Sequence, residues 1–298
     1  MAALDAFAFD STEWLGQREL FAREAERLRG VYATCAAQVA TPAENVTIPV
    51  ETHPDGSVKT LVKAARAQYF LKEGLVWGEA VEVRRLATNG VIEASIEAKS
   101  CVVDRATRSG WAEGAAKVTN GKTVFSGEGV YFSSSDSYVK VFGASSFASE
   151  DVRFGADSAD ASGPVRGRSQ TSDFDGKSGV MLFEGDVVVT SATNLTLCAD
   201  QLFMFLSGTN ELSRVVAVGS VSVTNDLRCG ACATAVYRRA KDELELFGDE
   251  QKPALLRECG ASARSLEGRV IRFWLGSEQV EVEQARIVSD TKGGKELL

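Results

Sequence analysis

Residues 78–83 read Gly-Glu-Ala-Val-Glu-Val, and residues 184–189 read Glu-Gly-Asp-Val-Val-Val. The valines of the first stretch, Val81 and Val83, recur in the second as Val187 and Val189, 106 positions along the chain. Val-Tyr at 130–131 returns at 236–237 with the same offset. A pattern that is kept at one spacing indicates two copies of one structural unit.

Alternation of apolar and polar residues dominates the chain after Pro49, and this period of two is typical of half-buried β-strands. Asn89-Gly90 and Asn120-Gly121 stand between such runs, as expected of hairpin turns. Near residue 200 the alternation shifts by one, from Leu197 and Ala199 to Leu202 and Met204. A strand that keeps one face apolar must bend there, so we predict long strands with a corner, stacked as a folded β-sandwich or jelly roll.

Residues 10–40 follow a helical period instead. Apolar or small residues spaced by seven, four and three form one stripe: Trp14, Phe21, Ala25, Leu28, Tyr32, Cys35 and Val39. Thr41-Pro42 supplies the stop. We predict an amphipathic helix that packs on its own domain, with a tether or partner-binding helix as the alternative.

The predicted fold class is therefore all-β with an N-terminal helix and two tandem β domains. The predicted segments are the helix at 10–40, a first β domain at 46–150, a linker at 151–172 rich in Gly, Ser and Asp, a second β domain at 173–290, and a charged tail at 291–298.

Composition excludes several classes of function. The 298 residues contain 33 Lys and Arg against 41 Asp and Glu, a net charge of −8, which argues against nucleic acid as a partner. His53 is the single histidine and stands in a turn-like segment, which argues against a Ser-His-Asp triad and excludes a multi-histidine zinc site. Cys229-Gly-Ala-Cys232 precedes strand-like sequence, not the helix that a thioredoxin-type redox pair requires. No stretch approaches the ~20 apolar residues of a membrane span.

Four short motifs carry a family resemblance. They are Glu-Gly-Asp-Val at 184–187, Cys-Ala-Asp-Gln-Leu at 198–202, Arg-Val-Val-Ala-Val-Gly-Ser-Val at 214–221 and Ala-Thr-Ala-Val-Tyr at 233–237. In this order they resemble the OstA-like periplasmic proteins of lipopolysaccharide transport, over residues 174–290. The more divergent residues 58–150 resemble the inner-membrane component of the same system. The resemblance implies two OstA-like jelly-roll domains, no cofactor, no catalysis, and a periplasmic location, with an inner-membrane association possible through a segment preceding Met1.

The resemblance also implies that the protein binds lipopolysaccharide or a similar acylated lipid in an apolar slot between β-sheets. Such a slot needs no catalytic group, because each buried CH₂ contributes about 0.8 kcal/mol. The alternation predicts the residues that face inward: Val81, Val83, Ile96, Val118, Val187, Val189, Leu195, Leu197, Leu202, Met204, Val216, Val218, Val221, Val223, Leu244, Leu246, Ile271, Phe273, Val280 and Val282. The same residues would equally fill the packed core of a structural β-solenoid scaffold that assembles end to end.

Edge strands are the expected contacts with other lipopolysaccharide-transport proteins, because an open edge can pair with the next chain. The last alternating segment, residues 278–285, is the candidate edge. Its glutamates could also be the charges that prevent such pairing.

Six cysteines, an even number, favour an oxidising compartment. Cys198 and Cys232 both precede a corner alanine, so the repeat places them opposite one another and predicts a disulfide. Weaker pairings are Cys35 with Cys101 and Cys229 with Cys259. Six reduced thiols are the alternative.

Overall fold

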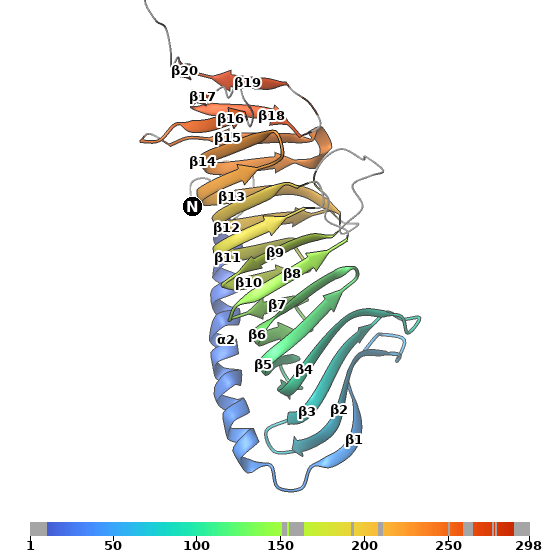
Figure 1. The fold of residues 1–298 in the computed structure, drawn as a ribbon. Coiled ribbons are helices and arrows are strands. Elements are labelled where there is room, and N and C mark those ends of the chain that lie inside the picture. Colours follow the sequence, from blue (N-terminus) through green and yellow to red (C-terminus); the bar gives the residue numbers. More distant parts are fainter. Residues whose placement is uncertain are drawn as a thin grey trace, which may run out of the picture. The chain divides into compact units, whose positions relative to one another are not determined.

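The computed structural model describes residues 11–150, 154, 164–191, 194–207, 211–249, 251–258, 265–275, 277 and 279–288. Within these ranges one α-helix precedes twenty strands (Figure 1). The predicted fold class, all-β with an N-terminal helix, is confirmed. The chain divides into two compact units, residues 1–151 with 168–183, and residues 152–167 with 184–298. That these units are two copies of one domain stays a prediction, and the predicted tail at 291–298 lies outside the described residues.

The first unit holds the helix and the first long strands, which are antiparallel to their neighbours. Its elements are α2 (Ser11–Gln38), β1 (Ala43–Thr52), β2 (Val58–Phe70), β3 (Leu75–Leu86), β4 (Ile92–Asp104), β5 (Ser109–Asn120), β6 (Thr123–Ser133), β7 (Tyr138–Val141), β8 (Ser145–Ser149), β10 (Thr171–Asp175) and the start of β11 (Val180–Thr190).

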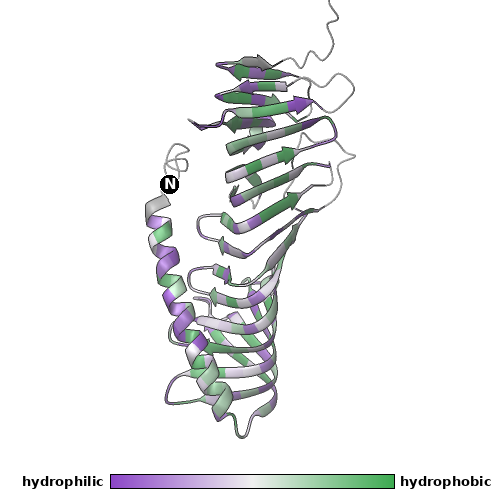
Figure 2. Ribbon diagram, turned by 60° about the vertical axis from the view of Figure 1, so that its left-hand side comes forward, coloured by the Kyte–Doolittle hydropathy of each residue, from purple (hydrophilic) through white to green (hydrophobic). Residues whose placement is uncertain are grey.

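The second unit continues the same pattern with strands that shorten toward the end of the chain. Its elements are the rest of β11, β12 (Thr196–Leu206), β13 (Leu212–Thr224), β14 (Arg228–Arg238), the short 3₁₀ turn η1 (Arg239–Lys241), β15 (Glu243–Phe247), β16 (Ala254–Glu258), β17 (Ser265–Gly268), β18 (Val270–Trp274), β19 (Val280–Glu283) and β20 (Arg286–Val288). Strand β9 (Val165–Ser169) lies at the boundary of the two units. Figure 2 shows hydrophobic and hydrophilic residues alternating along these strands.

Each long strand bends at a corner, as the shift in alternation predicts. Ala80 in β3 and Ser220 in β13 adopt left-handed φ values of 47° and 46°, and the β12–β13 register shifts between Cys198 and Gln201. The corner divides each unit into two limbs. We call limb A the segments that include 75–79, 100–104, 109–113, 130–133, β7 and β10 in the first unit, and 201–206, 212–218, 233–238, β15, β18 and β19 in the second. Limb B comprises 81–86, 92–98, 116–120, 123–127 and β8 in the first unit, and 187–190, 196–199, 221–224, 228–232, β16 and β17 in the second.

In some places the chain is interrupted at the corner, and two short strands, one in each limb, take the place of one long strand. In the first unit, β6 pairs with β7 on limb A and with β8 on limb B. In the second unit, β14 pairs with β15 on limb A and with β16 on limb B. The limbs therefore continue as two stacks of strands.

Helix α2 packs on limb A of the first unit, which confirms the prediction of a helix that packs on its own domain. The predicted apolar stripe meets an aromatic row of the sheet: Trp77, Val102, Trp111, Tyr131 and Tyr138. Phe21 stacks on Tyr138, with ring centroids 4.1 Å apart. Arg18 reaches Asp173 in β10 at 2.8 Å. The observed helix, Ser11–Gln38, lies within two residues of the predicted bounds.

The predicted linker at 151–172 is wrong in its second half. Residues 165–169 and 171–175 form β9 and β10, and β10 pairs with β7 from Ser172–Val141 to Asp175–Tyr138. Its polar residues made this stretch read as a loop, but Ser172 and Asp173 are buried through contacts that periodicity does not reveal. The rest of the predicted linker, apart from Phe154 and Pro164, lies outside the described residues.

Candidate functional site

Two close approaches show which faces of the limbs meet. In the first unit, a Cβ on Gly127 of limb B would lie 2.4 Å from Cγ1 of Val141 on limb A. In the second unit, a Cβ on Gly230 of limb B would lie 2.7 Å from Cδ1 of Leu246 on limb A. Residues that share a row with these four therefore face inward, because directly paired residues lie on one face of a sheet.

The inward face of limb B in the first unit is an apolar row that crosses seven strands. Its successive register partners are Ile48, Val62, Val83, Ile96, Val118, Phe125 and Phe147. A second row next to it includes Val81, Ala98, Ala116 and Gly127. The structure thus brings together all four residues predicted for the first copy. Sequence analysis missed Val62, Phe125 and Phe147, each of which has an apolar residue on one side that obscures the alternation.

In the second unit, two inward rows run along limb A. The first joins Leu202, Ala217, Ala235, Leu246, Ile271 and Val282. The second joins Met204, Val215, Tyr237, Leu244, Phe273 and Val280. On limb B, Leu197 and Val223 share the row of Gly230.

Val216 and Val218 correct the predicted inward set. Val216 pairs with Phe203 in β12 and with Val236 in β14, whereas Leu202 and Met204 pair with Ala217 and Val215. Because neighbours along a strand point to opposite faces, Val216 lies on the outer face of limb A. Val218, two residues further along β13, lies on the same outer face. The error arose from the bulge at Gly219 and Ser220, which shifts the alternation in β13.

The inward side chains of limb A and limb B contact one another, so the space between the limbs is filled. All but three of the twenty predicted residues are 0–8% exposed; Val218, Val280 and Val282 are half-buried. Rings from both limbs fill the interior of the first unit, with Phe125 and Phe174 centred 6.0 Å apart. The inward residues of the first strand, such as Ile48, are also half-buried. In the first unit the inward residues are therefore most accessible at β1, and in the second unit at β19.

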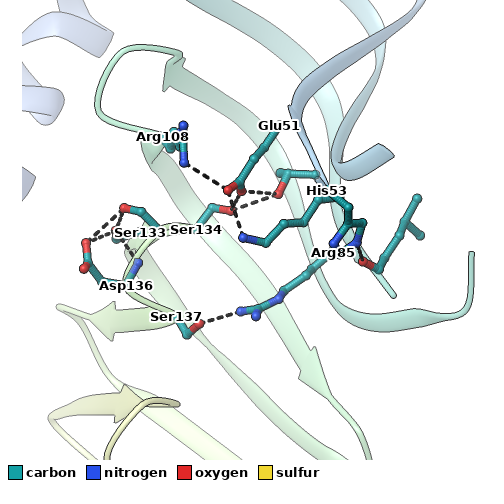
Figure 3. A network of polar contacts seen from close by, with 12 residues as sticks. Glu51, His53, Arg85, Arg108, Ser133, Ser134, Asp136 and Ser137 are labelled. Carbon is teal, nitrogen blue, oxygen red and sulfur yellow. Dashed lines mark hydrogen bonds and ion pairs between the residues drawn. The ribbon is translucent and has the colours of Figure 1, made fainter. Parts of the chain in front are cut away.

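A polar network joins the limb tips at the mouth of the first unit, opposite the corner (Figure 3). Glu51, near the end of β1, accepts from Lys59 Nζ at 2.8 Å on its own limb and from Arg108 Nη1 at 3.0 Å on limb A. Its other oxygen accepts from the Ser134 hydroxyl at 3.1 Å and the Thr60 hydroxyl at 3.3 Å. We call this group, Glu51 with its four donors, the mouth cluster.

Two further contacts bridge the same tips. The hydroxyl oxygens of Thr60 and Ser134 lie 2.9 Å apart, so one of these hydroxyls can donate either to Glu51 or to the other hydroxyl, and Arg85 Nη1 donates to the Ser137 hydroxyl. Burial opposes ionisation of Glu51, but the Lys59 and Ser134 hydrogen bonds and the charges of Lys59 and Arg108 outweigh it and lower its pKa. The carboxylate is thus held ionised between the limbs. Sequence analysis missed this network because it joins the ends of β1 and β2 to two turn residues, Arg108 and Ser134, that are far away in the chain.

His53, the single histidine, belongs to the surroundings of the mouth cluster. One ring nitrogen, Nε2, lies 2.9 Å from the Leu86 carbonyl oxygen at the end of β3, and the backbone N–H donates to Ser57 at 2.8 Å. It fixes the β1–β2 turn against the tip of limb B. Among the described residues, no group of three His, Cys, Asp or Glu side chains lies close enough to hold a metal ion.

The mouth of the second unit is bridged differently. Arg228, at the start of β14 on limb B, donates to the Ser277 carbonyl at 3.2 Å, beyond the end of β18 on limb A. Its guanidinium lies 5.7 Å from the centre of the inward Phe273 ring. Phe154 packs on the inward Tyr237, with ring centroids 5.2 Å apart. The mouth of the second unit thus contains an arginine and aromatic rings, whereas the mouth of the first unit contains the Glu51 carboxylate.

The predicted disulfides are wrong where the structure tests them. Cys198 in β12 and Cys232 in β14 are free, because β13 lies between their strands: Cys198 pairs with Ser222, and Cys232 with Val221. Two strand spacings of about 4.8 Å exceed the Cα separation that a disulfide allows.

Cys35 and Cys101 are also free. Cys35 lies on the helix, over the outer face of limb A, whereas Cys101 pairs with Gly78 and Ala112 in an inward row. The sheet separates the two thiols. The pairing of Cys229 with Cys259 stays a prediction, since Cys259 lies outside the described residues.

A β-sheet that is folded at a corner around an apolar interior in each unit places the chain among β-jelly-roll proteins. Residues 164–279 match the family described as LptA/(LptD N-terminal domain) LPS transport protein, which confirms the resemblance over that stretch. Among solved structures, the chain is similar to LptH, the LptA homologous periplasmic component of the lipopolysaccharide transport device from Pseudomonas aeruginosa. The identity is 17%, the TM-score 0.37, and the match covers 47% of this chain and 94% of that one. No curated protein matches the chain. No helix of the described residues has the length and apolarity to cross a membrane.

Proposed function

We propose that the protein is a non-catalytic periplasmic component of lipopolysaccharide transport that holds acyl chains between its limbs. The observation that carries this proposal is the pair of inward apolar rows in the second unit, which run unbroken from β12 to β19 inside the matched stretch and the strand that follows it. Acyl chains need a continuous apolar surface and no reactive group. At about 0.8 kcal/mol per buried CH₂, such a surface supplies the binding energy.

Entry of an acyl chain requires the limbs to part, because the inward side chains touch in the closed crevice. The ends offer the easiest access, since Val280, Val282 and Ile48 are half-buried. The register rows end on β1 and on β19, so these strands are the proposed contacts with the neighbouring transport proteins. A chain of such proteins would join their inward rows into one path.

Photo-crosslinking tests the proposal with a matched pair of positions in β19. Val282 pairs with Ile271 and faces inward, whereas its neighbour Glu281 pairs with Arg272 and faces outward. A benzoylphenylalanine at 282 is expected to crosslink saturably to lipopolysaccharide, and the same group at 281 is expected not to. Equal crosslinking at both positions, or none at either, would contradict the proposal.

The second candidate is the structural scaffold with a permanently packed interior. The deep burial of the inward side chains favours it, because a filled core needs no occupant. In that case neither position crosslinks to lipid, and the protein sediments as concentration-dependent end-to-end assemblies.

A further inference from the structure

We propose that the mouth cluster of the first unit is a binding site for the phosphate of a lipid headgroup, and that Glu51 occupies this site when no lipid is bound. The inference rests on the proposed function, since it assumes that acyl chains enter the crevice. It adds the chemical class of the headgroup and names the residues that recognise it.

The donors around Glu51 have the composition of an oxyanion site. One ammonium, one guanidinium and two hydroxyls converge on a single carboxylate whose side chain is only 8% exposed. Figure 3 shows Arg108 and Ser134 reaching Glu51 from limb A. A phosphate offers three strong acceptor oxygens and more negative charge than a carboxylate, so the same donors would bind it more strongly.

The position of the cluster matches the geometry of an amphiphile. Thr60 lies on the inward face of limb B, two residues or about 7 Å along β2 from Val62 toward the tip. A lipid whose chains lie along Val62 and Val83 would bring its headgroup to this tip. Lys59 and Arg108 are a quarter and a half exposed, so both can be reached from solvent.

The backbone around Glu51 allows its side chain to leave the four donors. The β1–β2 register is irregular on both sides of it, between Pro49 and Glu51 and between Glu51 and Thr52. A residue in a bulge can rotate without breaking a long ladder of hydrogen bonds. Displacement would also release the contacts from Glu51 to Arg108 and Ser134, which hold the limbs together at the mouth. Headgroup binding and opening of the crevice are thereby coupled.

A second donor lies beside the cluster. Arg85 binds Ser137 across the mouth through Nη1, and its Nε is buried without a hydrogen-bond partner, 3.3 Å from the Glu93 carboxylate. The tip thus carries a further guanidinium beside the mouth cluster, paired with Glu93 and Ser137.

The test compares binding of two probes to the full chain: lipid A with its phosphates, and the same lipid A after phosphatase treatment. Wild type is expected to bind the phosphorylated probe more tightly. In the Lys59→Gln/Arg108→Gln variant, this preference is expected to fall about tenfold, with binding of the dephosphorylated probe unchanged. The matched control is Arg66→Gln/Lys117→Gln, which removes the same charges from exposed pairs with Glu79 and Glu97. It should keep the wild-type preference.

Glu51→Gln tests the second half of the inference. It keeps the size of the side chain but removes the competing charge, so the phosphorylated probe is expected to bind several-fold tighter than to wild type. Weaker binding of that probe to a folded Glu51→Gln variant would overturn the idea that Glu51 occupies the phosphate site.

The outcomes separate this inference from the proposed function. If wild type binds neither probe, the lipid-binding function fails. If wild type binds both probes and the Lys59→Gln/Arg108→Gln variant keeps the wild-type preference, the function stands and the headgroup site is wrong.

Discussion

Both units have long strands that bend at a corner, but the outer face of limb A is covered differently in each. In the first unit the row of Trp77, Val102 and Trp111 is apolar and helix α2 covers it. The corresponding outward row of the second unit begins with Phe203, Val216 and Val236 and ends on Glu245 and Arg272, which pair with each other at 2.6 Å. The first-unit row likewise ends on a charged pair, Lys140 and Asp173, so what distinguishes the first unit is the covering helix. The inward rows are apolar in both. The interior is therefore the constant feature of the fold, and the outer face is where each unit acquires its own partner.

The comparison predicts the largest effect at Asp173, which holds the helix to the first unit. Its carboxylate is fully buried and binds Arg18 at 2.8 Å, Lys140 at 3.0 Å and the Tyr138 hydroxyl. Asp173→Asn leaves two largely buried cations without their anion and is expected to cost about 3–5 kcal/mol of unfolding free energy. Urea unfolding measures the loss, and hydrogen exchange of residues 11–38 should show the helix released.

Glu245→Gln is the matched change in the second unit. The Glu245 side chain is buried, but the side chains of its partners, Arg238 and Arg272, are about a third exposed. Water can solvate both guanidinium groups after the change, so the expected cost is smaller, about 1.5 kcal/mol. An equal loss of unfolding free energy in the two variants would mean that burial under the helix does not strengthen the contacts of Asp173.

The next effect concerns the shared interior. Leu246 lies in an inward row and has no exposed surface, so Leu246→Ala is expected to cost about 2–5 kcal/mol through lost burial and the cavity left behind. Leu227, in the β13–β14 turn, is 61% exposed, and Leu227→Ala should change stability by less than about 0.5 kcal/mol. Similar losses from both changes would contradict the assignment of the inward face.

Periodicity predicted the interior well and the outer contacts poorly. The stripe from Trp14 to Val39 predicted the helix, and the register places fifteen of the twenty predicted residues on an inward face, with no face assigned to Val187, Val189 and Leu195. Val216 and Val218 failed because a bulge adds a residue that has no signature of its own. The mouth cluster and the contacts of Asp173 could not be predicted, since each depends on residues more than 30 positions apart in the chain. A disulfide between Cys198 and Cys232 required adjacent strands, which no sequence pattern specifies.

A smaller effect appears in acid and compares the mouth of the first unit with the outer face of the second. Burial opposes ionisation of Glu51 and Glu245, but neighbouring cations lower both pKa values below the usual 4.5. A lowered pKa stabilises the folded state above pH 4.5, and this contribution disappears as the pH falls through the folded value. Glu51→Gln and Glu245→Gln should each weaken the acid dependence of stability. Urea unfolding at pH 7 and pH 3.5 measures the difference, and a variant with the full wild-type dependence would contradict the pairing.

The smallest effect is chemical and distinguishes the inward thiols from the outward one. Cys101 in the first unit and Cys232 in the second lie in inward rows, and burial raises the pKa of each to about 12. Both should resist iodoacetamide in the native protein at pH 8, because the thiolate is the reactive form. Cys198 shares the outward row of Ser222 and serves as the internal control that reacts first.

Mass spectrometry of peptides alkylated before and after urea unfolding measures this order. The same digest, run without reductant, tests the register directly. If β13 separates β12 from β14, no peptide joined through Cys198 and Cys232 can form in the folded chain, even under oxidising conditions. Recovery of that peptide would require β12 and β14 to be neighbours, and the inward rows of the second unit would have to be redrawn.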